Sequence, residues 1–67
     1  MRVSKNKLSL AMLKAEIDSS KHLAELSGVS VNTISRINNG SSAKLPTVRK
    51  LAKTLNVDPS ELIEQED

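Results

Sequence analysis

Apolar residues recur along the chain at three- and four-residue intervals, and no stretch shows the strict alternation of polar and apolar positions that is typical of a half-buried strand. Residues that favour helix ends separate the apolar groups. The pattern therefore predicts an all-α fold, a compact five-helix domain, with helices over about residues 5–16, 20–27, 31–38 and 48–55 and a short last helix from Pro59.

The start of each expected helix is marked by a residue whose side-chain oxygen can accept a hydrogen bond from the first backbone N–H groups. In chain order these N-cap residues are Ser4, Ser19, Ser30, Thr47 and Asp58. Val29 and Ile34 flank Ser30 at the two positions of a hydrophobic staple, so the third helix has the clearest start. Gly28 is suited to the left-handed conformation that ends the second helix, and Asn56 to the same position after the fourth.

The first expected helix does not reveal which of its faces is buried. Its apolar residues cover too much of the helix circumference to single out one face: Leu8, Leu10, Ala11, Met12, Leu13 and Ala15.

Length and composition narrow the possible functions. With 67 residues, the chain is expected to form one domain over 1–67, too small for most enzyme architectures. It has no Cys and a single His, which excludes disulfides and zinc fingers, and we expect no metal and no cofactor. The longest apolar run, Leu10 to Leu13, is far short of the roughly 20 residues that span a bilayer, so a cytoplasmic protein is expected.

The charges are unevenly distributed. The chain up to Lys53 has all ten basic residues and three acidic ones, a net charge of +7, whereas the remainder has five acidic residues and no base, including the acidic end 64–67. No carboxylate lies between Glu25 and Asp58, although five basic residues do: Arg36, Lys44, Arg49, Lys50 and Lys53. Such a stretch suits a polyanion. On charge alone, solvated helix faces are the favoured explanation.

The strongest functional signal lies around Gly28. Two helices that meet at roughly 90 to 120° across a short turn need a small residue at the crossing, a glycine in the turn and apolar residues beneath the second helix. Ala24, Gly28, Ile34 and Ile37 meet these needs, so we expect a helix-turn-helix over about 20–39. The second helix then presents its early residues outward, where the major groove of DNA could receive them: Val31, Asn32, Thr33, Ser35 and Arg36.

The segments LAELSGVSVNTISRINNG (23–40) and LPTVRKLAKTLNVDPSELIE (45–64) closely resemble the Cro/phage-repressor type helix-turn-helix family, also called XRE-like. The resemblance implies a five-helix protein that binds the major groove of double-stranded DNA, mostly as a homodimer. The family's base-reading positions fall on Val31, Asn32 and Arg36, with Thr33 close by. Its phosphate contacts fall on Ser19, Ser20, Asn39 and Lys44, and Ser30 is first a helix cap and only secondarily a phosphate contact.

Two positions depart from the family's pattern. One extra residue lies between Ile17 and Leu23, so the cap of the second helix is either Asp18 or Ser19. Many members also pair an arginine on the first helix with a glutamate near the end of the third, and the corresponding residues here are Met12 and Asn38. That salt bridge is therefore expected to be absent, and losing both partners together can be nearly neutral for stability.

The side chains at the expected reading positions have the required chemistry, because Asn can bond bidentately to adenine, Arg to guanine, and Val can pack against the thymine methyl group. We therefore expect a transcriptional regulator, most simply a repressor, of a prokaryotic or phage-like, nucleoid-associated kind. It would bind a pseudo-palindromic operator as a homodimer. The two copies would contact each other through the last helix and its flanks: Val57, Leu62 and Ile63.

Other classes remain open or are disfavoured. A protein-interaction module of the same fold, for example an antitoxin that binds a toxin, is one alternative, and the DNA-binding end of a longer regulator is another. Asp18, Ser19, Ser20 and His22 are residue types found in catalytic triads, but adjacency along a chain is not triad geometry, so no enzyme is expected.

Overall fold

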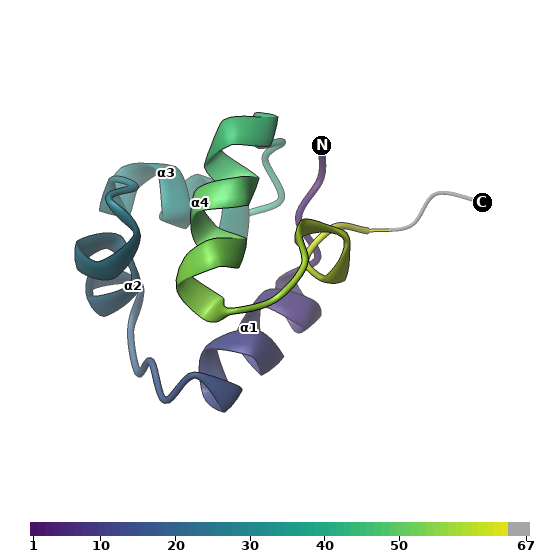
Figure 1. Ribbon diagram of the computed structural model, residues 1–67. Helices are drawn as coiled ribbons and strands as arrows, with labels where there is room; N and C mark the ends of the chain where they lie inside the picture. The colour runs from purple at the N-terminus through teal and green to yellow at the C-terminus, as the bar shows by residue number, and fades with distance from the viewer. Residues whose placement is uncertain (65–67) are drawn as a thin grey trace.

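A computed structural model describes residues 1–64 of the chain, so residues 65–67 of the expected acidic end lie outside the described residues. The described part has four α-helices, α1 (Lys5–Lys14), α2 (Ser20–Ser27), α3 (Val31–Asn38) and α4 (Leu45–Leu55), and one turn of 3-10 helix, η1 (Pro59–Glu61). α4 runs through the middle, α2 and α3 lie together on one side of it, and α1 lies beneath (Figure 1).

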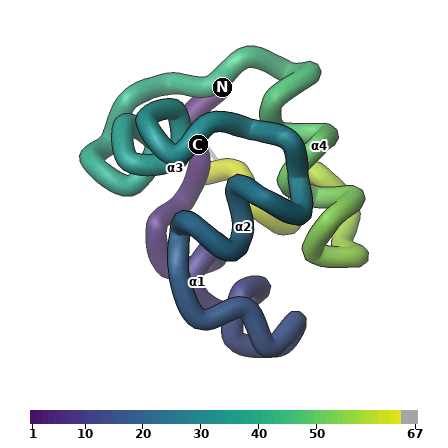
Figure 2. Tube along the Cα trace, turned by 90° about the vertical axis from the view of Figure 1, so that its left-hand side faces the viewer, coloured from purple at the N-terminus to yellow at the C-terminus, as the bar shows by residue number. Residues whose placement is uncertain are grey.

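A single hydrophobic core joins the helices. α2 contacts both α3 and α4, and the turned view shows α2 between them with α1 below (Figure 2). Seven side chains with less than 2 % exposure form the centre of this core: Leu8, Leu23, Ile34, Ile37, Val48, Leu51 and Leu62. Burying each contributes about 1.5–3 kcal/mol relative to exposure. All four α-helices and the residue after η1 therefore contribute side chains to the same interior.

α1 ends two residues earlier than expected. Glu16 has a φ of 59°, a left-handed conformation that stops the helix, and Ile17 N–H bonds to the carbonyl of Met12 at 2.9 Å. The Glu16 N–H bonds to the carbonyl of Leu13 at 3.1 Å, so the end of α1 is a Schellman motif. Positive φ is costly for a residue with a Cβ. Here the turn brings Ile17 into the core, where it is 6 % exposed.

The expected start of the fourth helix at Thr47 is wrong. α4 begins at Leu45, and its N-cap, Lys44, makes no capping bond with its side chain. Pro46 explains the earlier start. Backbone N–H groups in the first turn of a helix have no partner within the helix, so the N–H that proline lacks costs no hydrogen bond, and the fixed φ of proline suits the helix. At the other end, Asn56 has a φ of 57°, and its expected left-handed conformation is confirmed.

The expected fifth helix is one turn of 3-10 helix, over Pro59–Glu61. Its capping box is present, and bonds from the Ser60 backbone N–H and hydroxyl lower the pKa of the Asp58 carboxyl. The helix does not continue because Leu62 and Glu64 bond to the N-terminal segment: Ser4 N–H to the Leu62 carbonyl at 2.7 Å, and Glu64 N–H to the Arg2 carbonyl at 2.9 Å. The five-helix expectation thus becomes four α-helices within residues 1–64.

The N-terminal segment, Met1–Ser4, is extended and lies between two other segments. Val3 pairs with Ile63 on one side and Arg2 with Ser42 on the other, in isolated antiparallel bridges. Val3 is 3 % exposed and belongs to the core. Residues 1–4 therefore connect the loop after α3 with the segment after η1. No helix within residues 1–64 is long and apolar enough to cross a membrane.

Candidate nucleic-acid interface

α2 and α3 are joined by a short turn at Gly28, which has a φ of 76° as expected. α3 buries one face, with Ile34 0 % and Ile37 2 % exposed, and leaves the opposite face open. Of the four side chains expected to contact bases, Val31, Asn32 and Arg36 are exposed and Thr33 is half-buried. α3 therefore presents three of them to solvent along one short helix.

The start of α3 is held by two hydroxyl groups. The Ser30 hydroxyl accepts a hydrogen bond from the Thr33 N–H at 3.2 Å, which confirms Ser30 as the N-cap. The two hydroxyls, Ser30 Oγ and Thr33 Oγ1, also bond to each other at 2.9 Å. Whichever of them donates, the other keeps one free hydroxyl hydrogen. The capped turn can thus still donate one bond to a ligand.

The start of α2 is tied to the end of α3. Ser19 is the N-cap of α2, since its hydroxyl accepts from the His22 N–H at 3.1 Å; Asp18 is not the cap. The Asn38 side-chain amide donates to the Ser20 hydroxyl at 3.4 Å, across 18 positions of sequence. Ser20 acts there as acceptor, so its own hydrogen remains available to donate. This bond brings Ser19 and Ser20 together with Asn39.

Met12 and Asn38, which stand where many family members have a charged pair, have structural roles of another kind. Asn38 bonds to Ser20, as described, and Met12 is half-buried against the core. Within residues 1–64 the only ion pair joins Arg2 and Glu64, at 4.0 Å. An uncharged hydrogen bond between α2 and α3 therefore accompanies the absence of a charged pair between α1 and α3.

The loop after α3 is fixed at both ends. Ser41 N–H bonds to the Arg36 carbonyl at 2.9 Å, and Gly40 takes a φ of 94°, so the chain turns immediately after Asn39. Further along, Ala43 N–H bonds to the Met1 carbonyl at 2.7 Å. Asn39 and Lys44 are both exposed at the two ends of this loop. The N-terminal segment therefore holds a loop that supplies two of the expected phosphate contacts.

The electrostatics of this side favour an anion. Neither α2, α3 nor α4 has an acidic residue in its first turn, where helices commonly place one to stabilise the partial positive charge of their N-terminus. The Arg36 and Lys44 side chains form no ion pair with any of residues 1–64. The backbone N–H groups in the first turns of α2 and α3 other than those capped by Ser19 and Ser30, together with these two cations, are thus left for an external negative group.

A family model of the Cro/C1-type HTH DNA-binding domain matches residues 7–67, nearly the whole chain. The chain belongs to this family. Searches among curated proteins and among solved structures found no match. Membership agrees with the resemblance on residues 23–40 and 45–64, and it assigns the chain to DNA-binding domains as a class.

In this Cro/C1-type domain, the residues expected between two copies are divided between surface and core. Val57 and Ile63 are half-buried and adjoin the core, whereas Leu62 is 0 % exposed. The Leu62 side chain therefore has no surface within one copy to offer to another. Local sequence does not signal this difference, because Leu62 joins a core cluster whose other members come from distant parts of the chain.

Two structural features of the domain were not anticipated from its sequence. The Ser20 to Asn38 bond joins residues that no local pattern connects, and the N-terminal segment is too short to show a periodicity. The β-branched Val3 followed by the helix cap Ser4 is the only trace of the segment in the sequence.

Proposed function

We propose that this Cro/C1-type domain is a transcriptional regulator that recognises a short sequence of double-stranded DNA through α3. The observation that carries the proposal is the outward face of α3. Val31, Asn32 and Arg36 are exposed there on a rigid, capped helix, no carboxylate stands in its first turn, and Arg36 has no ion-pair partner within residues 1–64.

The three exposed side chains suit base edges in the major groove. Asn32 would bond to adenine N6 and N7, Arg36 to guanine O6 and N7, and Val31 would pack against a thymine methyl group. Val31 is 42 % exposed, which costs free energy in water and favours an apolar contact. Thr33 is half-buried and bonded to Ser30, so we assign it a supporting position beside the readers.

The phosphate contacts would flank the readers. α3 has eight residues and is therefore about 12 Å long, close to the width of the major groove. Ser19, Ser20 and Asn39 are grouped by the Ser20 to Asn38 bond at the far end of α3 from Val31 and Asn32, and Lys44 follows the next loop. The base-contacting side chains in the groove and the hydrogen-bond donors beside the phosphates would then bind DNA at the same time. Ser30 would contribute to phosphate binding only through its spare hydroxyl hydrogen.

We infer that the regulator is a repressor that binds DNA as a homodimer, because one copy would contact too few base pairs to select a single site. One short helix reads only a few base pairs, while a genome offers at least about 10⁶ competing sites. Two copies on a pseudo-palindromic site, with their reading helices about 34 Å apart, double the number of base contacts. A domain this small, bound over a promoter, would act by excluding polymerase.

The test is selection of bound sequences from random duplexes by the full chain, with Arg36→Ala selected in parallel. We expect an enriched pseudo-palindrome, and loss of preference at one position of each half-site with Arg36→Ala. A footprint on the enriched site should cover two half-sites. A footprint over one half-site with a single bound copy would contradict the dimer, and no enrichment at all would contradict sequence reading and support a protein-interaction module instead.

A further inference from the structure

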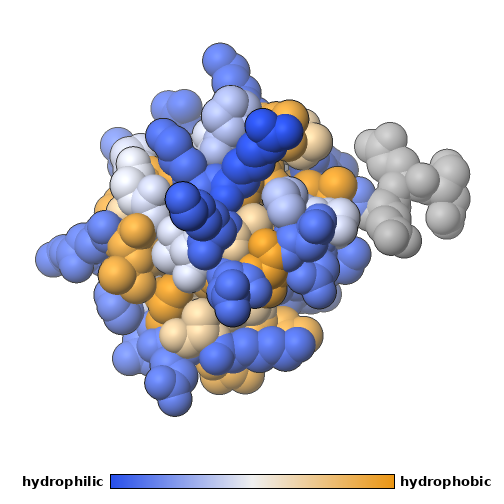
Figure 3. All heavy atoms as spheres, in the orientation of Figure 1, coloured by the Kyte–Doolittle hydropathy of each residue, from blue (hydrophilic) through white to orange (hydrophobic). Residues whose placement is uncertain are grey.

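Two strongly exposed leucines lie on α1, outside the site described above. Leu10 is 53 % and Leu13 is 73 % exposed. They are three positions apart, so they are neighbours on one helix face. Hydrophobic side chains also reach the surface along the lower edge of the molecule in the space-filling view, where α1 lies (Figure 3). Single exposed leucines are common. Two adjacent ones on a short helix form a ridge, and we call them the α1 ridge.

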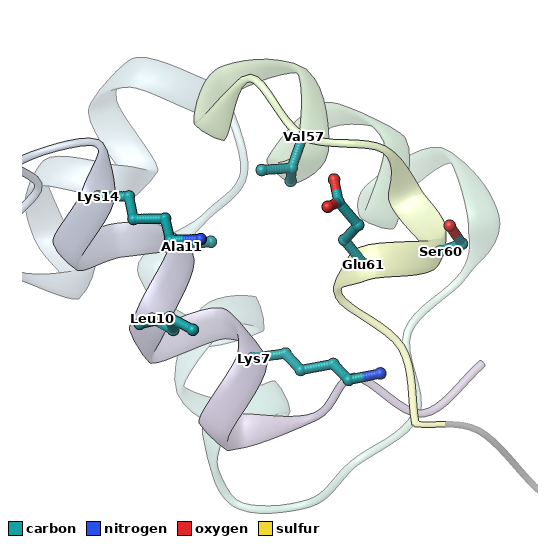
Figure 4. A pocket seen from close by; sticks show the side chains of 7 residues that line it. All are labelled: Lys7, Leu10, Ala11, Lys14, Val57, Ser60 and Glu61. Carbon is teal, nitrogen blue, oxygen red and sulfur yellow. The ribbon is translucent and has the colours of Figure 1, made fainter.

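A hollow lies on each side of the α1 ridge. Leu10 borders a groove of about 370 Å³ between α1 and η1, with Lys7, Ala11 and Lys14 on the α1 side and Val57, Ser60 and Glu61 across from them (Figure 4). Leu13 borders a shallower hollow of about 300 Å³, which Ser9, Met12, Ile17 and Asp18 also line. A ridge between two grooves is the surface that a second helix packs against.

The charges around the ridge are self-complementary. From Met1 to Ala15 the chain has four basic residues and no carboxylate, whereas the segment from Asp58 to Glu64 across the groove has three acidic residues and no base. Lys14 and Glu61 line the same groove, yet Lys14 forms no ion pair with any of residues 1–64. The groove beside the ridge thus has bases on its α1 wall and an acid on its η1 wall, and a two-fold copy of this surface can place each sign against the other.

We propose that the α1 ridge and its two hollows bind a second copy of this chain, with α1 packed against the partner's α1. Leu10 and Leu13 of each copy enter the hollows of the other, and Lys14 of each copy faces Glu61 of the other. The proposal rests on the homodimer of the proposed function and names a surface for it. It replaces the buried Leu62 by two exposed leucines, and keeps Val57 because Val57 lines the same groove.

This arrangement leaves the reading helix free. α1 lies at the lower end of the molecule and α3 in its upper part in both views (Figures 1 and 2). Lys7 donates to the Ile63 carbonyl at 3.2 Å, and Glu61 accepts from the Asp58 N–H at 2.9 Å, so both sides of the groove are held in place within one copy. The contact between copies would therefore form on a preorganised surface.

The first test measures the oligomeric state of the full chain without DNA, by sedimentation equilibrium over a range of concentrations. Leu10→Gln combined with Leu13→Gln removes the ridge, and Leu26→Gln is the matched control because Leu26 is 56 % exposed on α2. We expect the double variant to raise the dimer dissociation constant by about tenfold or more, and the control to leave it unchanged. Far-UV circular dichroism checks that each variant is folded.

The second test exchanges the charges and does not depend on the double variant. Lys14→Glu alone and Glu61→Lys alone should each weaken the dimer, and the two together should restore it, because the ion pair between copies is rebuilt with reversed signs. A dimer that neither the leucine nor the charge variants weaken would overturn the proposal and place the contact elsewhere. So would a wild type that stays monomeric with and without DNA. Sequence selection by the same samples is read separately, so that either result leaves the reading of DNA by α3 open to its own test.

Discussion

The outward faces of α3 and α1 differ in polarity, and therefore in the kind of partner that each can bind. Each helix buries one face in the shared core, but α3 presents mostly polar side chains to solvent and α1 presents Leu10 and Leu13. Polar side chains cost nothing in water, so the residues on α3 can wait exposed for a polar ligand. Exposed leucines do cost free energy, because their apolar surface stays in contact with water. The two faces therefore suit different partners, a polyanion for α3 and an apolar surface for α1.

Both helices pack on one core, so the largest expected effect on stability comes from a cavity in that core beneath α3. Ile34→Ala should lower the free energy of unfolding by about 2–5 kcal/mol, because Ile34 is 0 % exposed and its removal leaves a cavity. Urea unfolding followed by circular dichroism measures the change. Val31→Ala on the outward face of the same helix is the control and should change stability by no more than about 0.5 kcal/mol. Equal losses for the two variants would show that α3 is not packed by its Ile34 face.

The turn between α2 and α3 tests whether their relative angle depends on Gly28. Gly28→Ala should lower the free energy of unfolding by about 1–2 kcal/mol through backbone strain, since Gly28 has a φ of 76°. An added Cβ would meet no atom within 4 Å, so we expect no displacement of α3 and little change in DNA affinity for the folded protein. Gly28→Asn should cost less, because Asn tolerates the left-handed conformation better. A loss of DNA affinity larger than the loss of stability would contradict a purely local strain.

The N-cap of α3 can be tested separately from the core and the turn. Ser30→Ala should lower the free energy of unfolding by about 1 kcal/mol, because the Thr33 N–H loses its acceptor. Ser35→Ala is the matched control, since Ser35 is exposed within α3 and its side chain caps no helix. Thermal unfolding of both variants distinguishes a capping role from a general effect of removing a hydroxyl. The assignment of Ser30 fails if the two variants behave alike.

The accuracy of sequence-based prediction differed between local and distant interactions. The bounds of α2 and the start of α3 were predicted correctly, although the cap of α2 was left open between Asp18 and Ser19. Ser19 and Ser30 accept from backbone N–H groups three residues along the chain, and Gly28 ends α2 through its own left-handed φ. The start of α4 was missed because Thr47 is a favoured N-cap residue, whereas the helix begins at Leu45 and takes Pro46 into its first turn. That no fifth α-helix forms within residues 1–64 depends on backbone bonds of Leu62 and Glu64 with Ser4 and Arg2, about sixty positions away.

The candidate site was predictable to a similar extent. Exposure of Val31, Asn32 and Arg36 follows from the helical phase of Ile34 and Ile37, which the sequence shows directly. The Ser20 to Asn38 bond could not be foreseen, because it depends on the angle between two helices. The outward position of Leu10 and Leu13 could likewise not be predicted. Apolar residues of α1 occupy most of its circumference, so its buried face is decided by the segments packed against it.

The smallest effect is expected at the acidic end of the chain. Removing residues 65–67 should change DNA affinity little at physiological salt, where the Debye length is about 8 Å and charges further from the bound phosphates are screened. Fluorescence anisotropy with the selected duplex compares the truncated and full chains. A large rise in affinity on truncation would instead mean that the acidic end competes with DNA for the basic surface.

The most direct test of the central claim, that α3 reads bases while the following loop anchors phosphates, is a salt titration of DNA affinity for Arg36→Ala and Lys44→Ala. Each variant is measured on the selected duplex and on a scrambled one. Arg36→Ala should cost about 1–3 kcal/mol on the selected duplex and little on the scrambled one. Lys44→Ala should weaken both duplexes alike and make the slope of log affinity against log salt shallower by about one unit per subunit. Equal weakening of both duplexes by Arg36→Ala, with selective weakening by Lys44→Ala, would contradict the account and reverse the two roles.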